Sequence, residues 1–110
     1  MGAIDRRHLD EQCAGDAALA AELLDLFAGQ CRRILPALAD AGLDTHARAD
    51  HAHTLKGSAA GVGAERIRGL CARIEDALRQ GVAPADDLRA LEAAAAEALD
   101  EIARGVSAQG

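Results

Sequence analysis

Apolar residues recur every three or four positions along this chain, in stretches that turn-forming residues separate. The clearest stretch runs from Asp16 to Gly42. Its apolar positions are Leu19, Leu23, Leu26, Phe27, Ile34 and Leu38. This spacing places one apolar stripe along an α-helix, for which Asp16 is a typical N-cap. Pro36 is expected to kink the helix without ending it, because the stripe resumes two residues later.

The second and third helices are predicted on either side of a glycine-containing turn. Asp44 or Thr45 is expected to cap a helix that continues to about Ala60. The next helix is expected from about Ala64 to Gln80. Its apolar stripe consists of Ile67, Leu70, Cys71, Ile74 and Leu78.

A fourth helix is expected to open at Pro84, because proline suits the first turn of a helix. Its core positions are Leu88, Leu91, Ala95, Leu99 and Ile102. Short connections make sequential helices antiparallel neighbours. The sequence therefore predicts one all-α domain, an antiparallel up-down-up-down four-helix bundle over about residues 16–104. A short N-terminal cap helix is expected at residues 5–13, and residues 105–110 are expected to fray.

Charge and cysteine content exclude several classes of protein. The formal net charge of -6 disfavours nucleic-acid binding, which needs a basic face. The apolar runs are shorter than a membrane-spanning helix requires. The cysteines are Cys13, Cys31 and Cys71, and none of them forms a C-x-x-C pair. We therefore expect buried thiols and a reducing, cytoplasmic location, with neither a disulfide framework nor a zinc knuckle.

Residues 53–64 read H-T-L-K-G-S-A-A-G-V-G-A, which is an unusual composition for a helix. Each interior glycine costs roughly 1 kcal/mol relative to alanine. At 100° per residue, His53 faces away from the core, with Lys56 and Gly57 beside it on the next turn. Small residues at Ala49, Gly57 and Ala60 are expected to form a floor around the imidazole. Such a floor lets another macromolecule reach the ring.

The same residues carry a family resemblance. The string H-T-L-K-G-S, followed by Gly63 and by R-I-x-x-x-C-x-R-I at residues 66–74, resembles the histidine-containing phosphotransfer (HPt) family of multistep His–Asp phosphorelays. The similarity extends over about residues 16–102. It implies that His53 accepts a phosphoryl group from an aspartyl phosphate on a receiver domain and relays it to another receiver aspartate.

The resemblance also implies roles for the neighbours of this histidine. Lys56 is expected to stabilise the phosphoryl oxygens, Gly57 to give access, and Ser58 to support the site. Family members often carry glutamine on the next helix beside the histidine, where this chain appears to have Glu75. Glu75 is expected to accept the ring N–H and fix the tautomer. Arg79, four residues later, is expected to offset the negative charge of this carboxylate.

A carrier that meets and leaves two partners needs a small, weak docking surface. We expect that surface to include Ala49, Gly57, Ala60 and Arg79, together with exposed Ile4 and Leu9. The implied partners are response-regulator receiver domains and a hybrid histidine kinase. The chain itself is expected to be a monomer without a cofactor, with Mg²⁺ on the receiver. Since a Walker A loop is missing from the sequence, we expect a phosphocarrier without ATP-dependent kinase activity, not an enzyme.

Two alternative functions remain open at this point. His46, Asp50 and His53 share one helix face and suggest a metal site, although the positive charge of Lys56 disfavours it. The stronger alternative is a non-phosphorylated helical-bundle adaptor that binds receiver or kinase domains through the same face.

Overall fold

The computed structural model describes the backbone of residues 2–109 and the side chains of residues 2–105. Over this range the chain is helical, without a β-strand. The helices are α1 (Arg6–Gln12), α2 (Ala17–Ala39), α3 (Thr45–Val62), α4 (Glu65–Arg79) and α5 (Ala85–Gln109). The predicted all-α class is therefore confirmed. No helix within residues 2–109 is long and apolar enough to cross a membrane.

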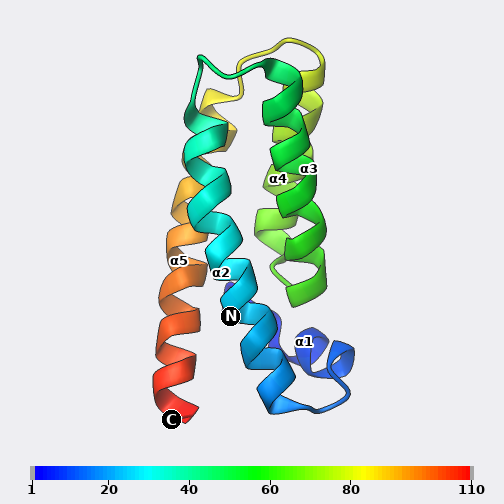
Figure 1. The fold of residues 1–110 in the computed structure, drawn as a ribbon, viewed down its shortest axis with the longest axis vertical. Helices are drawn as coiled ribbons and strands as arrows, with labels where there is room; N and C mark the ends of the chain where they lie inside the picture. Colours follow the sequence, from blue (N-terminus) through cyan, green and yellow to red (C-terminus); the bar gives the residue numbers. More distant parts are fainter. Residues whose placement is uncertain (1, 110) are drawn as a thin grey trace.

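The four longer helices lie side by side in a body of 43 × 22 × 22 Å, and α1 lies near one end (Figure 1). Helix α2 contacts α3 and α5, and α4 contacts the same two helices, so the four form a closed ring. In Figure 1 the chain direction reverses from each of these helices to the next. Helix α1 packs against α2 and α3.

Side-chain caps fix the starts of α2 and α3. The Asp16 carboxylate accepts a hydrogen bond from the Leu19 N–H at 3.1 Å, as the sequence predicted. Asp44, rather than Thr45, caps α3 by accepting from the Ala47 N–H at 3.2 Å. Helix α2 continues through Pro36, although it ends at Ala39, earlier than the predicted end at Gly42.

The other ends differ by a few residues from prediction. Helix α3 continues past Ala60 to Val62. Helix α5 continues to Gln109, beyond the end expected near residue 104. Residue 110 of the predicted frayed tail lies outside the described residues.

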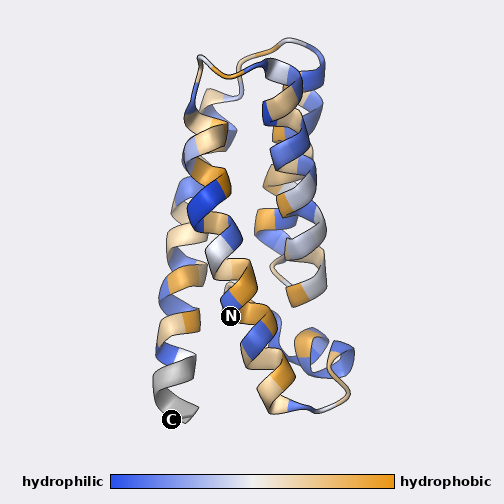
Figure 2. Ribbon diagram, viewed as in Figure 1, coloured by the Kyte–Doolittle hydropathy of each residue, from blue (hydrophilic) through white to orange (hydrophobic). Residues whose placement is uncertain are grey.

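The core is built mainly from aliphatic residues. Figure 2 shows apolar and polar positions interleaved along the helices. All five predicted stripe residues of α4 are buried. On α2 the prediction was partly wrong, because Leu19 and Leu26 are 39% and 66% exposed. The inward face of α2 is instead centred on Ala20, Leu24, Phe27, Cys31, Ile34 and Leu38. Leu19 and Leu26 are seven residues apart and therefore share one helix face, which adjoins the buried face. The apolar pattern alone thus predicts a buried stripe that is too wide.

The three cysteines are buried and unpaired, as predicted. Burial raises the pKa of Cys31 to about 11. Burial, with the neighbouring Cys31, raises the pKa of Cys71 to about 12. Both thiols therefore stay protonated at neutral pH and pack as small apolar groups.

The N-terminal segment is anchored at the turn between α3 and α4. Gly63 has a left-handed φ of 76°, and its carbonyl accepts a hydrogen bond from the Asp5 N–H at 2.9 Å. A Cβ at Gly63 would lie 2.9 Å from the Asp5 carbonyl oxygen, so only glycine fits this contact. The anchored segment inserts Ile4 and Leu9 into the core, where they are 3% and 0% exposed. The prediction that these two residues form an exposed docking surface is therefore wrong.

Candidate functional site

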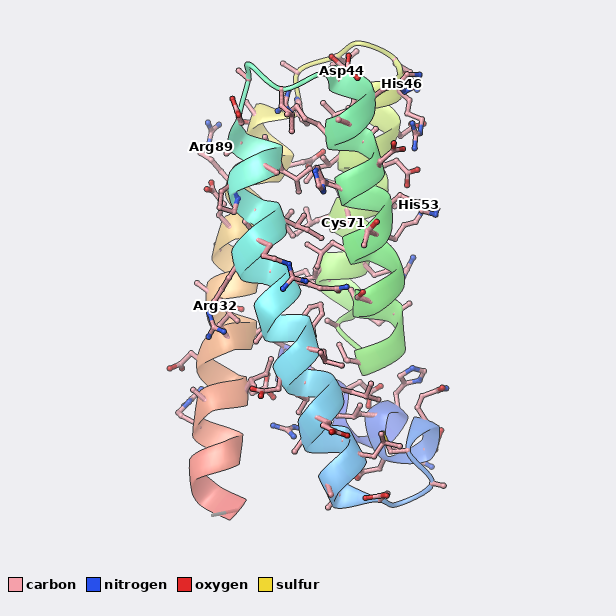
Figure 3. All side chains as sticks on the ribbon, viewed as in Figure 1. Arg32, Asp44, His46, His53, Cys71 and Arg89 are labelled. Carbon is pink, nitrogen blue, oxygen red and sulfur yellow. The ribbon has the colours of Figure 1, made fainter. Side chains whose placement is uncertain are left out.

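His53 lies on the outer face of α3, where its side chain is 64% exposed. Figure 3 shows the ring projecting away from the bundle. The predicted exposure of His53 is therefore confirmed. Helix α3 continues for two further turns beyond this residue, so its backbone holds the ring at a fixed place on the surface.

Glu75 of α4 lies against the inner edge of the His53 ring. Nδ1 of His53 is 3.1 Å from Oε2 and 3.3 Å from Oε1 of this carboxylate. An ionised carboxylate only accepts hydrogen bonds, so Nδ1 must be the protonated nitrogen of the neutral ring. The other nitrogen, Nε2, then carries the free lone pair. The pair thus selects the tautomer in which Nε2 is unprotonated.

Lys56 binds the same carboxylate from the next turn of α3. Its Nζ donates to Oε1 of Glu75 at 2.8 Å, and the side chain of Glu75 is only 14% exposed. Burial by itself would raise the pKa of Glu75, but the hydrogen bonds from Lys56 and His53 outweigh it and hold the pKa below its usual value. Glu75 therefore stays ionised at neutral pH, as its contact with Nδ1 requires.

Arg79 completes a cluster along the seam between α3 and α4. Its Nη2 donates to Oε2 of Glu75 at 3.3 Å and to Oδ1 of Asp50 at 3.1 Å. Its Nη1 lies 3.3 Å from Nδ1 of His46. The predicted pairing of Arg79 with Glu75 is present, whereas the bridge to Asp50 was not predicted. Two cations and two carboxylates thus balance in charge beside His53.

The small residues around His53 are arranged differently from the predicted floor. Gly57 is exposed, and a Cβ added there would meet nothing within 4 Å. Ala60 is half-buried, and its carbonyl accepts a hydrogen bond from Nε2 of His8 at 3.0 Å. Ala49 is fully buried, so its predicted place in the floor is wrong. Helix α3 packs against both α2 and α4, and its buried arc is therefore wider than the single stripe assumed.

Ser58 lies apart from the charged cluster. It lines a groove of about 340 Å³ between α2 and α3, together with Gly61, Leu23 and Leu26. This position places Ser58 on the flank of α3 that faces α2, whereas Lys56 faces α4. The structure therefore does not bring Ser58 together with Lys56 and Glu75.

The arrangement also bears on the metal-site alternative. Arg79 contacts both His46 and Asp50, so a guanidinium group lies where a shared ion would have to bind. Among the residues with described side chains, no group of three or more potential ligands could hold a metal ion. The cluster is therefore an ion-pair network.

Comparison with protein-family models matches residues 18–106 to the Hpt domain. Neither the curated proteins nor the solved structures contain a match. The matched range includes His53 and every member of the charged cluster around it.

Proposed function

This chain belongs to the Hpt domain family, and on that basis we propose that His53 accepts a phosphoryl group from a receiver aspartyl phosphate and relays it to another receiver aspartate. Hpt domains act as phosphocarriers in phosphorelays, not as kinases. The observation that carries the proposal is the contact of Nδ1 with Glu75 on an exposed ring. This contact leaves Nε2 unprotonated where a partner can reach it.

The proposed transfer needs little chemistry from this chain. The lone pair of Nε2 forms the N–P bond, while the P–O bond to the receiver aspartate breaks and its electron pair returns to the carboxylate. Nδ1 keeps its proton, so the product is a phosphoimidazolium whose positive charge faces Glu75. In the reverse direction the ring leaves as neutral imidazole. Glu75 thus favours both steps by holding one proton in place.

Mg²⁺ in this proposal belongs to the receiver, where it neutralises charge on the phosphoryl group. Lys56 is the cation that this chain supplies, since it lies one turn from His53 on α3 and its ammonium binds the same carboxylate as the His53 ring. The three buried, unpaired cysteines support a reducing, cytoplasmic location for this carrier, which we propose acts as a monomer.

The proposed docking surface follows the exposed crest of α3 and includes Gly57 and Ala60. Arg79, which was also expected there, lies at the end of α4, and we assign it to the charged cluster with Glu75 and Asp50. Gly61 continues this crest beyond Gly57, and a Cβ there would also meet nothing within 4 Å. The groove beside Gly61 brings in Leu26, which is two-thirds exposed on α2. These residues replace the buried Ile4, Leu9 and Ala49 in the docking surface expected from the sequence.

Phosphotransfer from a panel of phosphorylated receivers tests this function against the adaptor alternative. The carrier should gain an acid-labile, alkali-stable label from at least one receiver and pass it to a second. If receivers bind the folded protein but none labels it, the non-phosphorylated adaptor is the correct function.

Lys56→Ala is expected to slow transfer to His53 about tenfold while receiver affinity changes less than about twofold, because the lysine acts on phosphoryl charge that develops during transfer. Stopped-flow transfer and receiver titration on the same variant separate the two effects. Equal losses in affinity and rate would instead make Lys56 a docking residue.

A further inference from the structure

Glu75 receives three hydrogen-bond donors at once, from His53, Lys56 and Arg79. In the proposed reaction Lys56 must also serve the phosphoryl group, which brings up to two negative charges to the ring. Each contact that Lys56 makes with phosphoryl oxygens weakens its contact with Glu75. The negative charge of the Glu75 carboxylate would then be less neutralised by Lys56, and it would repel the nearby phosphoryl group.

Resting on the function proposed above, we propose that Arg79, anchored by Asp50, is a positioning residue for the phosphorylated state. Arg79 neutralises the negative charge of the Glu75 carboxylate and keeps it hydrogen-bonded to Nδ1 of His53 when Lys56 binds the phosphoryl group. Arg79 acts through Glu75, and the phosphoryl group itself is left to Lys56.

The geometry favours this division between the two cations. Lys56 carries its charge on a flexible stem one turn from His53, so its ammonium can change partners without a helix movement. The guanidinium of Arg79 is planar and bridges Asp50 on α3 and Glu75 on α4. That bridge restrains Arg79 on the far side of Glu75 from Lys56, because the two cations bind different oxygens of the carboxylate.

Neutralisation by Arg79 is needed only because residue 75 is a glutamate, which carries a negative charge. A neutral amide could accept the Nδ1 proton without repelling phosphate. The effect of Arg79 on transfer should therefore depend on the charge of residue 75, which a direct effect on phosphate or receiver would not.

A double-mutant cycle tests this dependence. We expect Arg79→Ala to slow labelling of His53 by a saturating phospho-receiver about tenfold, the coupling typical of contacting charged groups. In a Glu75→Gln background the same substitution should slow labelling less than about twofold. Arg79→Lys should restore part of the rate. Arg73→Ala is the matched control, since Arg73 is also an exposed arginine of α4 but pairs with Asp87 of α5.

A second readout distinguishes positioning from general stability. In ¹⁵N NMR spectra of the phosphorylated parent protein, Nδ1 of His53 should carry a proton that is protected from exchange with water. In Arg79→Ala this proton should lose its protection from exchange. Equal rate losses from Arg79→Ala with glutamate and with glutamine at position 75 would overturn the inference and make Arg79 a phosphate or docking contact. If the parent protein takes no label from any receiver, the proposed function itself fails, and this inference fails with it.

Discussion

His53→Gln should reduce the label transferred from a phospho-receiver to the level of a reaction without carrier. Glutamine keeps a polar side chain of similar length but has no nitrogen lone pair able to attack phosphorus. The site is exposed, so the fold should survive with an unchanged circular dichroism spectrum. Gel transfer assays at equal protein concentration measure the loss.

His51→Gln is the matched control for this substitution. His51 lies on the same helix but is half-buried and does not contact Glu75 among the described hydrogen bonds. The His51→Gln variant should be labelled on His53 at nearly the rate of the parent protein. Label that persists on His53→Gln would show that another residue is the acceptor.

Gly57→Gln should slow transfer by at least about tenfold, equivalent to roughly 1.4 kcal/mol at the transition state. The side chain would occupy the open space next to His53, where the receiver must approach. Helix α3 should meanwhile become slightly more stable, because glycine is a weaker helix former than glutamine. The midpoint temperature of thermal unfolding should therefore rise, while the rate of phosphotransfer should fall.

Gly69→Gln provides the control for the effect of a larger side chain. Gly69 is also a helical glycine with nothing within 4 Å of an added Cβ. It lies on α4 between Arg66 and Arg73, which both pair with residues of α5, so it faces away from His53. Only Gly57→Gln should impair transfer. A parent-like transfer rate for Gly57→Gln would show that the receiver does not need the open space beside His53.

Features set by neighbouring residues in the sequence were predicted well. The Asp16 cap, the helix that continues through Pro36 and the exposure of His53 each depend on positions within one or two helical turns. The pairing of Arg79 with Glu75 is also local, because both lie on one face of α4. Such short-range geometry follows from the helix alone.

Features set by packing between helices were not predictable in the same way. Ala49 is buried because two neighbouring helices cover α3, and Leu9 is buried because Gly63 anchors the N-terminal segment. The bridge from Arg79 to Asp50 depends on the register between α3 and α4. The sequence indicates Asp50 only as a metal-ligand candidate, because its spacing from His53 contains no information about an arginine on another helix.

The nitrogen of His53 that carries phosphorus tests the proposed role of Glu75 directly. Two-dimensional ¹H–¹⁵N NMR of the phosphorylated protein, with ³¹P coupling, assigns the N–P bond to a single ring nitrogen. Glu75 holds the proton on Nδ1, so phosphorus is expected on Nε2 of His53. Phosphorus on Nδ1 of His53, or on any other residue, would contradict it.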